Sequence, residues 1–377
     1  MSSPLKEARA ARGWSQEKLV REIERFAREH LLDVPTTASL RVYVSEWENG
    51  KRRISVALAA VLRPLLGLTD DELRGRGDRP VAPSLADGYT DLLTRIDSAG
   101  SVGADMLHSF TEQTELLRTF DRQMGAAGLV DQMTAHLSAL EDALTFAVLP
   151  EARRPVAQAL AAASTLAAWQ ALDAGAVERA WRNYELAKRA AREAEDPLYL
   201  AHAMAEQAYV LREAGRTEDA LALVREARRA GGRLLSPRLN AWLHAAEAEL
   251  CAVAGFADDC RWALDRAAAA LPAGETARDP DMLSIFLNDA HLSRWRGNAL
   301  AMLGDGEAVN SLYSALDDMD STFIRAESGL RCDLAQAHLA RGEIGPAEEH
   351  LRRARLLAGR TGSVRQRRRV DQLSLRL

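Results

Sequence analysis

Apolar residues recur at helical spacing along most of the chain, and in the first 75 residues they outline short amphipathic helices. In the second of these, Leu19, Ile23 and Phe26 share one face. Helices are predicted for residues 4–12, for a segment that starts at Ser15, and for residues 39–48, 55–66 and 69–73. The pattern therefore predicts a bundle of five short helices in the N-terminal part of the chain.

A second pattern begins after residue 151, where glycines mark helix-to-helix turns. They stand at positions 175, 215, 255, 304 and 342, with spacings of 40, 40, 49 and 38 residues. Seven residues before each glycine is a small residue: Ala168, Ala208, Ala248, Gly297 and Ala335. Five residues after each is a small or slender one, and nine after is a larger one: Ala180, Ala220, Cys260, Val309 and Ala347, then Tyr184, Val224, Leu264, Tyr313 and Leu351. Because antiparallel helices approach closely only where facing residues are small, this pattern predicts stacked α-hairpins.

The two patterns define the domain organisation. Residues 1–75 form the N-terminal bundle, and residues 76–88, rich in Gly, Pro and Arg, are a linker. Residues 89–150 add helices near 89–98, 103–124 and 128–148. The repeats occupy residues 151–360, and the basic segment 361–377 forms a capping helix.

Composition and charge refine this picture. Hydrophobic residues make up 47% of the chain and aromatic residues only 5%, with Ala and Arg abundant, which favours an all-α protein. The net charge of −5 is unevenly distributed, because residues 1–80 hold 15 Lys and Arg against 12 Asp and Glu, and residues 352–377 hold nine Arg against one Asp. Basic ends around an acidic middle fit nucleic-acid contact at the ends and other partners in the middle.

Several classes of function find no support in the sequence. The phosphate-loop pattern G-x-x-x-x-G-K-[ST] is missing, as are H-E-x-x-H and G-x-S-x-G, so we expect no enzyme. Cys251, Cys260 and Cys332 form no C-x-x-C pair and occupy small core positions, so we expect no metal and no cofactor. No apolar run reaches 18 residues and no signal sequence follows Met1, which favours a cytoplasmic protein without a membrane partner.

The N-terminal bundle carries a family resemblance. The segment ENGKRRIS from Glu48, preceded by Gly13-Trp14-Ser15-Gln16, resembles the phage-repressor (Xre-type) helix-turn-helix domain. Residues 39–48 would then be the helix that enters the DNA major groove. The inserted segment HLLDVPTTA, residues 30–38, departs from the family's tight turn.

The resemblance implies roles for individual residues. Gln16 would touch a phosphate or a base edge, and Arg41 and Val42, with Glu46 one turn later, would face the bases. Lys51, Arg52 and Arg53 would hold phosphates, which gives affinity without sequence information. The full set of expected DNA-contacting residues is Gln16, Arg41, Val42, Tyr43, Ser45, Glu46, Lys51, Arg52 and Arg53. Arg9 and Glu48 match a family pair that forms an internal ion pair. The alternative is a bundle that no longer contacts DNA and binds only protein.

The repeats resemble tetratricopeptide repeats, at about 40 residues instead of the usual 34. In such superhelical stacks the first helix of each pair lines a concave groove. The position of a residue relative to the glycine of its repeat predicts which side chains face this groove. They are aromatic, amide and charged: Trp169, His202, Tyr209, Arg212, Trp242, Glu249, Asn288, His291, Arg294, Asn298 and Gln336. Amides and Arg suit the backbone and carboxylates of an extended peptide, and aromatic rings supply apolar pockets. The alternative is that the aromatic residues are packing between helices and the charges a solvated face.

The combined resemblance implies a five-helix lambda-repressor-like helix-turn-helix domain followed by a right-handed superhelix of tetratricopeptide-like α-hairpin repeats. Such a chain is similar to peptide-responsive regulators of the RRNPP class, which act in quorum sensing. It would be a homodimeric transcriptional regulator that binds a double-stranded DNA operator and a peptide or small-molecule effector. The alternative function is a DNA-tethered adaptor whose repeats dock a partner protein. A deep, closed groove would favour the effector and a shallow, open groove the adaptor. The effector, the operator and the direction of regulation stay open.

Overall fold

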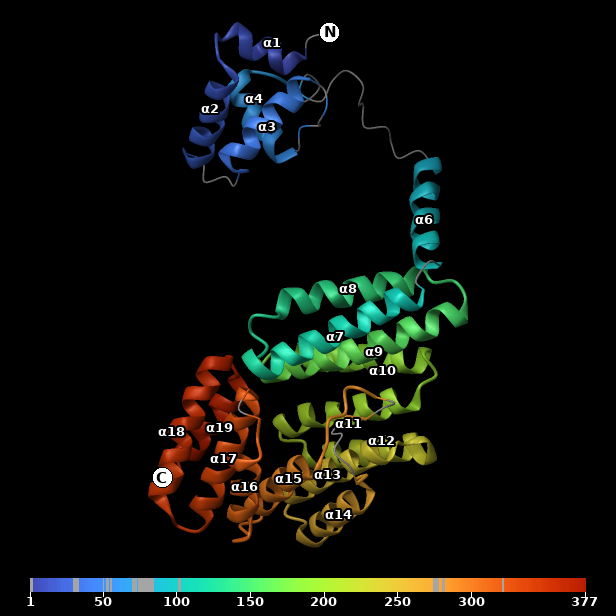
Figure 1. Cartoon of the computed structure of the whole chain (residues 1–377), viewed down its shortest axis with the longest axis vertical. Helices are drawn as coiled ribbons and strands as arrows, with labels where there is room; N and C mark the ends of the chain where they lie inside the picture. Colours follow the sequence, from blue (N-terminus) through green and yellow to red (C-terminus); the bar gives the residue numbers. More distant parts are fainter. Residues whose placement is uncertain are drawn as a thin grey trace. The chain divides into compact units, whose positions relative to one another are not determined.

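The computed structural model describes residues 3–29, 34–49, 51, 54, 56–69, 73, 85–100, 103–273, 278–279, 282–320 and 322–377. Within these residues the secondary structure is helical, apart from an isolated antiparallel bridge between Arg278 and Phe286, which confirms the all-α class. The chain forms two compact units, Met1–Leu92 and Leu93–Leu377 (Figure 1). No described helix is both long enough and apolar enough to cross a membrane.

The N-terminal unit contains the first four predicted helices: α1 (Pro4–Ala11), α2 (Gln16–Glu29), α3 (Thr37–Glu48) and α4 (Val56–Leu66). Each helix contributes to one apolar core, in which Leu5, Leu19, Leu40 and Leu62 are buried. Helix α3 begins two residues before the predicted start because the Thr36 hydroxyl caps it. Of the predicted fifth helix, residues 70–72 lie outside the described residues.

Helix α6 (Leu85–Gly100) begins inside the predicted linker. Residues 76–84 of that linker lie outside the described residues, whereas residues 85–88 are helical, so the predicted boundary at residue 88 was wrong. The physical reason is that Leu85 and Ala86 are strong helix formers, and a single glycine at position 88 costs a helix only about 1 kcal/mol.

The second unit continues as a series of antiparallel helices. Its elements are α7 (Ala104–Met124), α8 (Val130–Phe146), α9 (Pro150–Asp173), α10 (Val177–Glu193), α11 (Pro197–Glu213), α12 (Thr217–Gly231), η1 (Gly232–Leu234), α13 (Pro237–Val253), α14 (Ala257–Ala270), α15 (Asp289–Met302), α16 (Ala308–Asp317), α17 (Ile324–Ala340), α18 (Ile344–Thr361) and α19 (Val364–Ser374). The hairpins α9–α10, α11–α12, α13–α14, α15–α16 and α17–α18 turn at the predicted glycines. Their φ angles of 73–78° lie in the left-handed region that favours glycine. The α-hairpin repeats are therefore confirmed.

The small residues of the repeat lie where helices touch. Ala168, Ala208, Ala248 and Ala335 are completely buried. At Gly297 a Cβ atom would come 2.6 Å from Cγ of a leucine in α16, so α15 and α16 can pack this closely only around a glycine. The three cysteines are free and fully buried, as expected for core residues.

One large repeat position departs from the prediction. Tyr313 is 37% exposed instead of buried. Its hydroxyl lies 3.1 Å from Nε2 of His338 and 3.0 Å from Nε2 of His350, so the ring is partly exposed while its hydroxyl contacts two buried histidines.

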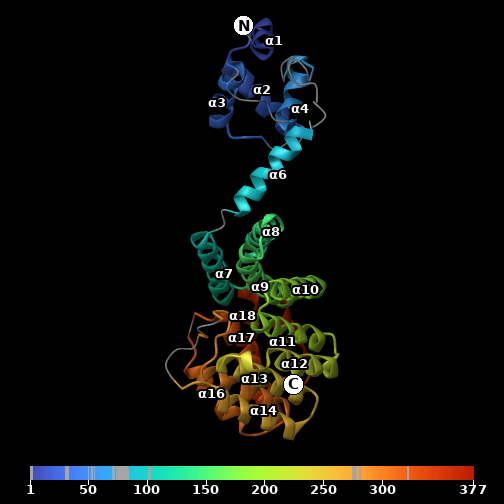
Figure 2. The same ribbon diagram turned by 90° about the vertical axis from the view of Figure 1, so that its right-hand side faces the viewer.

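The last helices return to the first helices of the second unit, as both views show (Figures 1 and 2). Ser363 donates a hydrogen bond to Asp173 at the end of α9, at 2.7 Å, across 190 residues of sequence. The carbonyl oxygen of Thr361 lies against Gly125 after α7, and Arg325 of α17 pairs with Asp121 of α7 at 2.7 Å. The C-terminal end of the array, from α17 to the start of α19, therefore contacts its first helices.

Candidate functional sites

The N-terminal unit contains the predicted internal ion pair. Arg9 Nη2 lies 3.0 Å from Glu48 Oε2, and both side chains are largely buried. Gln16 Nε2 donates to the same carboxylate oxygen at 2.8 Å. Burial acts to raise the pKa of Glu48, but the bonds from Arg9 and Gln16 outweigh it and hold that pKa below its ordinary value. The Arg9–Glu48 pair is confirmed, and Gln16 belongs to the same network; its contact with DNA stays a prediction.

The outer face of α3 carries the residues predicted to read bases. Arg41 is well exposed, 3.6 Å from the exposed Glu17, and Val42 is 53% exposed. Ser45 and Glu46 are half-buried further along the helix. An exposed arginine beside an exposed valine is a surface that suits base edges and a thymine methyl group.

The remaining predicted DNA-contacting residues differ in placement. Lys51 is exposed just beyond α3. Tyr43 is half-buried, with its ring centroid 5.9 Å from that of Trp47, so only part of its surface is exposed. Arg52 and Arg53 lie outside the described residues.

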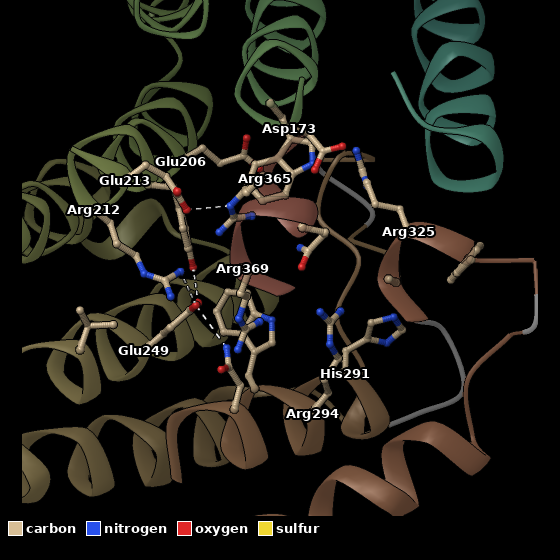
Figure 3. Close-up of a pocket in the computed structure, with 18 of the residues that line it drawn as sticks. Asp173, Glu206, Arg212, Glu213, Glu249, His291, Arg294, Arg325, Arg365 and Arg369 are labelled. Carbon is tan, nitrogen blue, oxygen red and sulfur yellow. Dashed lines mark hydrogen bonds and ion pairs between the residues drawn. The ribbon is translucent and has the colours of Figure 1, made fainter. Parts of the chain in front are cut away.

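A cavity of about 860 Å³ lies inside the second unit (Figure 3). Ten of the eleven side chains predicted for the groove line it: Trp169, His202, Tyr209, Arg212, Trp242, Glu249, His291, Arg294, Asn298 and Gln336. The repeat phase thus located one connected surface, although its assignment to effector binding stays a prediction. Asn288 was placed wrongly: it is the N-cap of α15 and accepts the backbone N–H of His291 at 2.9 Å.

Glu249 on α13 forms hydrogen bonds with side chains of two neighbouring helices on one side of the cavity. Its carboxylate accepts hydrogen bonds from Tyr209 at 2.9 Å, Arg212 at 2.8 Å and Asn298 at 3.2 Å. Burial acts to raise the pKa of Glu249, but the charges of Arg212, Arg365 and Arg369 and the Tyr209 hydrogen bond together outweigh it and hold that pKa below its ordinary value, so the group is a carboxylate at neutral pH. This network ties α11, α13 and α15 to one another through a single carboxylate.

Aromatic rings occupy two places in the wall. Trp169 is covered by the guanidinium groups of Arg365 and Arg325, 5.2 and 5.7 Å from its ring. Trp242 lies between His202 and Trp295, with ring centroids 5.3 and 5.5 Å away. Trp242 and Trp295 therefore offer apolar surface, whereas Trp169 anchors arginines.

The sequence interpretation missed the wall that α19 supplies. Figure 3 shows Arg365 and Arg369 between the Arg212–Glu249 pair and the Arg294–His291 side. The residues of α19 that face the cavity are Arg365, Gln366, Arg368, Arg369, Gln372 and Leu373, and Arg376 just beyond the helix also lines it. Arg365 pairs with Glu213 of α11 at 2.9 Å and Arg369 with Asp333 of α17 at 2.6 Å. Arginines three to four residues apart lie on one face of a helix, and this spacing in the sequence could have indicated that α19 presents a basic face.

The lining is rich in cations. It contains nine arginines and five carboxylates, the latter Asp121, Asp173, Glu206, Glu213 and Glu249. Burial raises the pKa of Asp121 even though Arg325 lies beside it. The cavity therefore favours ligands that bring negative charge.

Comparison with known proteins gives little further information. No protein-family model matches the chain, and no curated protein matches it. Among solved structures the chain is similar to that of aspartyl phosphate phosphatase F from Bacillus subtilis, with 12% identity and a TM-score of 0.44 over 93% of this chain and 96% of that one. Function has to be inferred from the chain's own residues.

Proposed function

We propose that the chain is a sequence-specific DNA-binding transcriptional regulator, not an enzyme, whose repeat domain binds a signalling peptide or small effector and mediates dimerisation. The observation that carries the proposal is the cavity. Its volume of about 860 Å³ falls in the range of sites for small ligands, about 300–1,000 Å³. It combines tryptophan surface with convergent arginine and amide groups, which suits a short peptide.

Closure of the array favours an effector over an adaptor. The bonds that α19 makes to α9 and α11 cover the concave side, where an adaptor would dock a folded partner. A ligand in this cavity contacts both the first and the last helices of the array. Such a ligand acts on DNA binding only through a difference in affinity between two arrangements of the domain.

The effector half of the proposal is tested by native mass spectrometry of the full chain purified from its own host. We expect a bound species of low mass that is released on unfolding. Recovery of a stoichiometric protein partner, with no small ligand, would favour the adaptor.

The DNA-binding half rests on the exposed face of α3 together with the basic residues after it. Mapping of genomic binding sites, repeated with culture extract, tests it directly. A set of sites that the extract changes would support both halves of the proposal. An absence of sites would contradict regulation of transcription.

We expect Arg41→Ala to relax base preference at one position of the operator. Loss of a bidentate contact to guanine removes about 1–3 kcal/mol of discrimination. The measurement is fluorescence anisotropy with the mapped operator and with versions changed at single base pairs. Lys51→Ala is the matched control, because loss of a phosphate contact weakens all sequences alike and lowers the salt dependence by about one ion. Equal loss on every sequence for Arg41→Ala would contradict its role in base recognition.

A further inference from the structure

Two half-buried arginines of the cavity wall lack a carboxylate of their own; Arg368 and Arg376 also form no ion pair within the described residues, but their side chains are exposed. Arg122 of α7 forms no ion pair within the described part of the chain, and its guanidinium lies 5.1 Å from the ring of Phe286 and 5.8 Å from that of Phe323. Arg294 of α15 comes only to 3.9 Å of Asp333, whose carboxylate Arg369 already holds at 2.6 Å. Every other arginine labelled in Figure 3 has an ion pair of 2.9 Å or less.

The two arginines belong to one corner of the cavity. The guanidinium of Arg122 lies over the ring of Phe286, whose centroid is 4.7 Å from that of His291. Arg294 lies three residues after His291 on α15 and so on the same face of that helix. Burial, with the positive charges of Arg294 and Arg122, lowers the pKa of His291 to about 4. His291 is therefore neutral at pH 7 and does not add to the charge, and both arginines lie near enough to its ring to lower its pKa.

Unused hydrogen-bond donors lie along the same wall. Arg118 Nη2 and Arg325 Nη1 are buried without a hydrogen-bond partner among the described residues, and both side chains line the cavity. Burial, with the nearby charge of Arg118, lowers the pKa of Arg122 to about 10, which still leaves it protonated at neutral pH. Buried cations and unpaired N–H groups are costly unless an anion offsets them, and a bound ligand can supply that anion.

We propose that Arg122 and Arg294 form an anion subsite of the cavity that takes a carboxylate of the effector. The proposal rests on the effector-binding function above and names the chemistry of its ligand. The carboxylate comes from the C-terminus of a peptide or from an Asp or Glu side chain, and both present the planar oxygen pair that a guanidinium binds. Phe286 and Phe323 beside it accept an adjoining apolar side chain. A monoanion fits better than a dianion, because five carboxylates share the lining.

The test uses three synthetic hexapeptide libraries with the full chain. One has free C-terminal carboxylates and no Asp or Glu, one has the same sequences as C-terminal amides, and one has amides that include Asp and Glu. Peptides retained after gel filtration are identified by mass spectrometry. We expect carboxylate-bearing peptides to be enriched about tenfold over neutral amides. Enrichment in the first library identifies the C-terminus as the source, and enrichment in the third identifies a side chain.

Variants connect the preference to the two arginines. Arg122→Gln and Arg294→Gln should each reduce the enrichment to near unity while neutral amides are still retained. Arg179→Gln, which removes the same charge from an exposed position on α10, should leave it unchanged. Far-ultraviolet circular dichroism verifies that each variant is folded.

The failures are distinguishable. If the wild type retains neutral amides as well as carboxylate-bearing peptides, the anion subsite is wrong and effector binding stands. If the preference survives in both Gln variants, the carboxylate binds elsewhere and the assignment is overturned. If the wild type retains no peptide from any library, the peptide form of the proposed function fails, and the subsite with it.

Discussion

Replacing Gly125 by alanine is expected to destabilise the second unit by about 2–6 kcal/mol. Gly125 has a φ of +83° and a ψ of 174°, a backbone conformation that is almost confined to glycine and costs a residue with a side chain about 1–3 kcal/mol. Its Cβ would also lie 2.1 Å from the carbonyl oxygen of Thr361, so the end of α18 must move away from α7, and displacement of packed groups adds about 1–3 kcal/mol. Urea unfolding of the full chain, followed by helical circular dichroism, measures the loss.

Gly215→Ala separates the two contributions. Gly215 has a similar φ of +75°, but nothing lies within 4 Å of the position its Cβ would take. It should cost only the backbone term, about 1–2 kcal/mol. Equal losses in the two variants would mean that Thr361 does not press on Gly125 and that the array is open at this point. Because α19 follows directly, Gly125→Ala should also weaken retention of the effector, whereas Gly215→Ala should not.

The repeat phase predicted most of the cavity because it is a local property. A glycine that ends one helix fixes the rotation of the residues before it, so the position six residues earlier repeatedly faces the same side. Trp169, Tyr209, Glu249, Asn298 and Gln336 all follow this rule and all line the cavity. Asn288 failed because the 49-residue repeat contains an insertion, and α15 begins only at Asp289.

The closure of the array could not be predicted in the same way. It depends on groups such as Ser363 and Asp173 that are 190 residues apart, and no periodicity relates them. The charge of the C-terminal segment was visible in the sequence and was interpreted as a capping surface. Arg365 and Arg369 instead turn inward, because Glu213 and Asp333 supply the counter-charges there. Arg122 lies on a helix that precedes the repeats, so counting residues from the repeat glycines could not predict that it faces the cavity.

In the N-terminal unit the local elements were predicted well and the surface less so. The helical periodicity gave the core, and Ser15 caps α2 as expected, since its hydroxyl accepts the N–H of Lys18 at 3.1 Å. The sequence did not predict which of the expected DNA-contacting side chains form contacts within the unit. Gln16 and Tyr43 both make contacts within the unit, because a small bundle has few other polar partners and little other apolar surface to offer.

Lowering the pH from 7 to 5 is expected to destabilise the second unit by several kcal/mol. Burial lowers the pKa values of His244, His291 and His350 to about 4, and Arg228, Arg294 and Arg331 respectively add to the effect. In the unfolded chain each returns to about 6.5. Between these values the unfolded state binds protons that the folded state does not, so stability is complete above pH 6.5 and falls as the pH approaches 4.

The size of this effect follows from the same values. Each histidine contributes about 2 kcal/mol between pH 7 and pH 5. Glu249 and Glu185, whose pKa values lie below the ordinary 4.5, stay ionised in this window and do not contribute. Asp121, with its raised pKa, acts in the opposite sense, because the folded state gains a proton as the pH falls. The histidines outnumber it, so the net change remains a loss.

A single substitution tests the assignment. In His244→Gln the amide oxygen can still accept the bond that Arg228 now donates to the ring at 2.8 Å, but no proton is taken up on unfolding. Urea unfolding at pH 7 and at pH 5 should therefore show a difference smaller by about 2 kcal/mol than in the wild type. His108→Gln, at an exposed position on α7, should reproduce the wild-type difference. A wild-type stability that stays constant over this range would mean that water reaches these rings and that their pKa values are ordinary, and the closed packing around His244 would then be wrong.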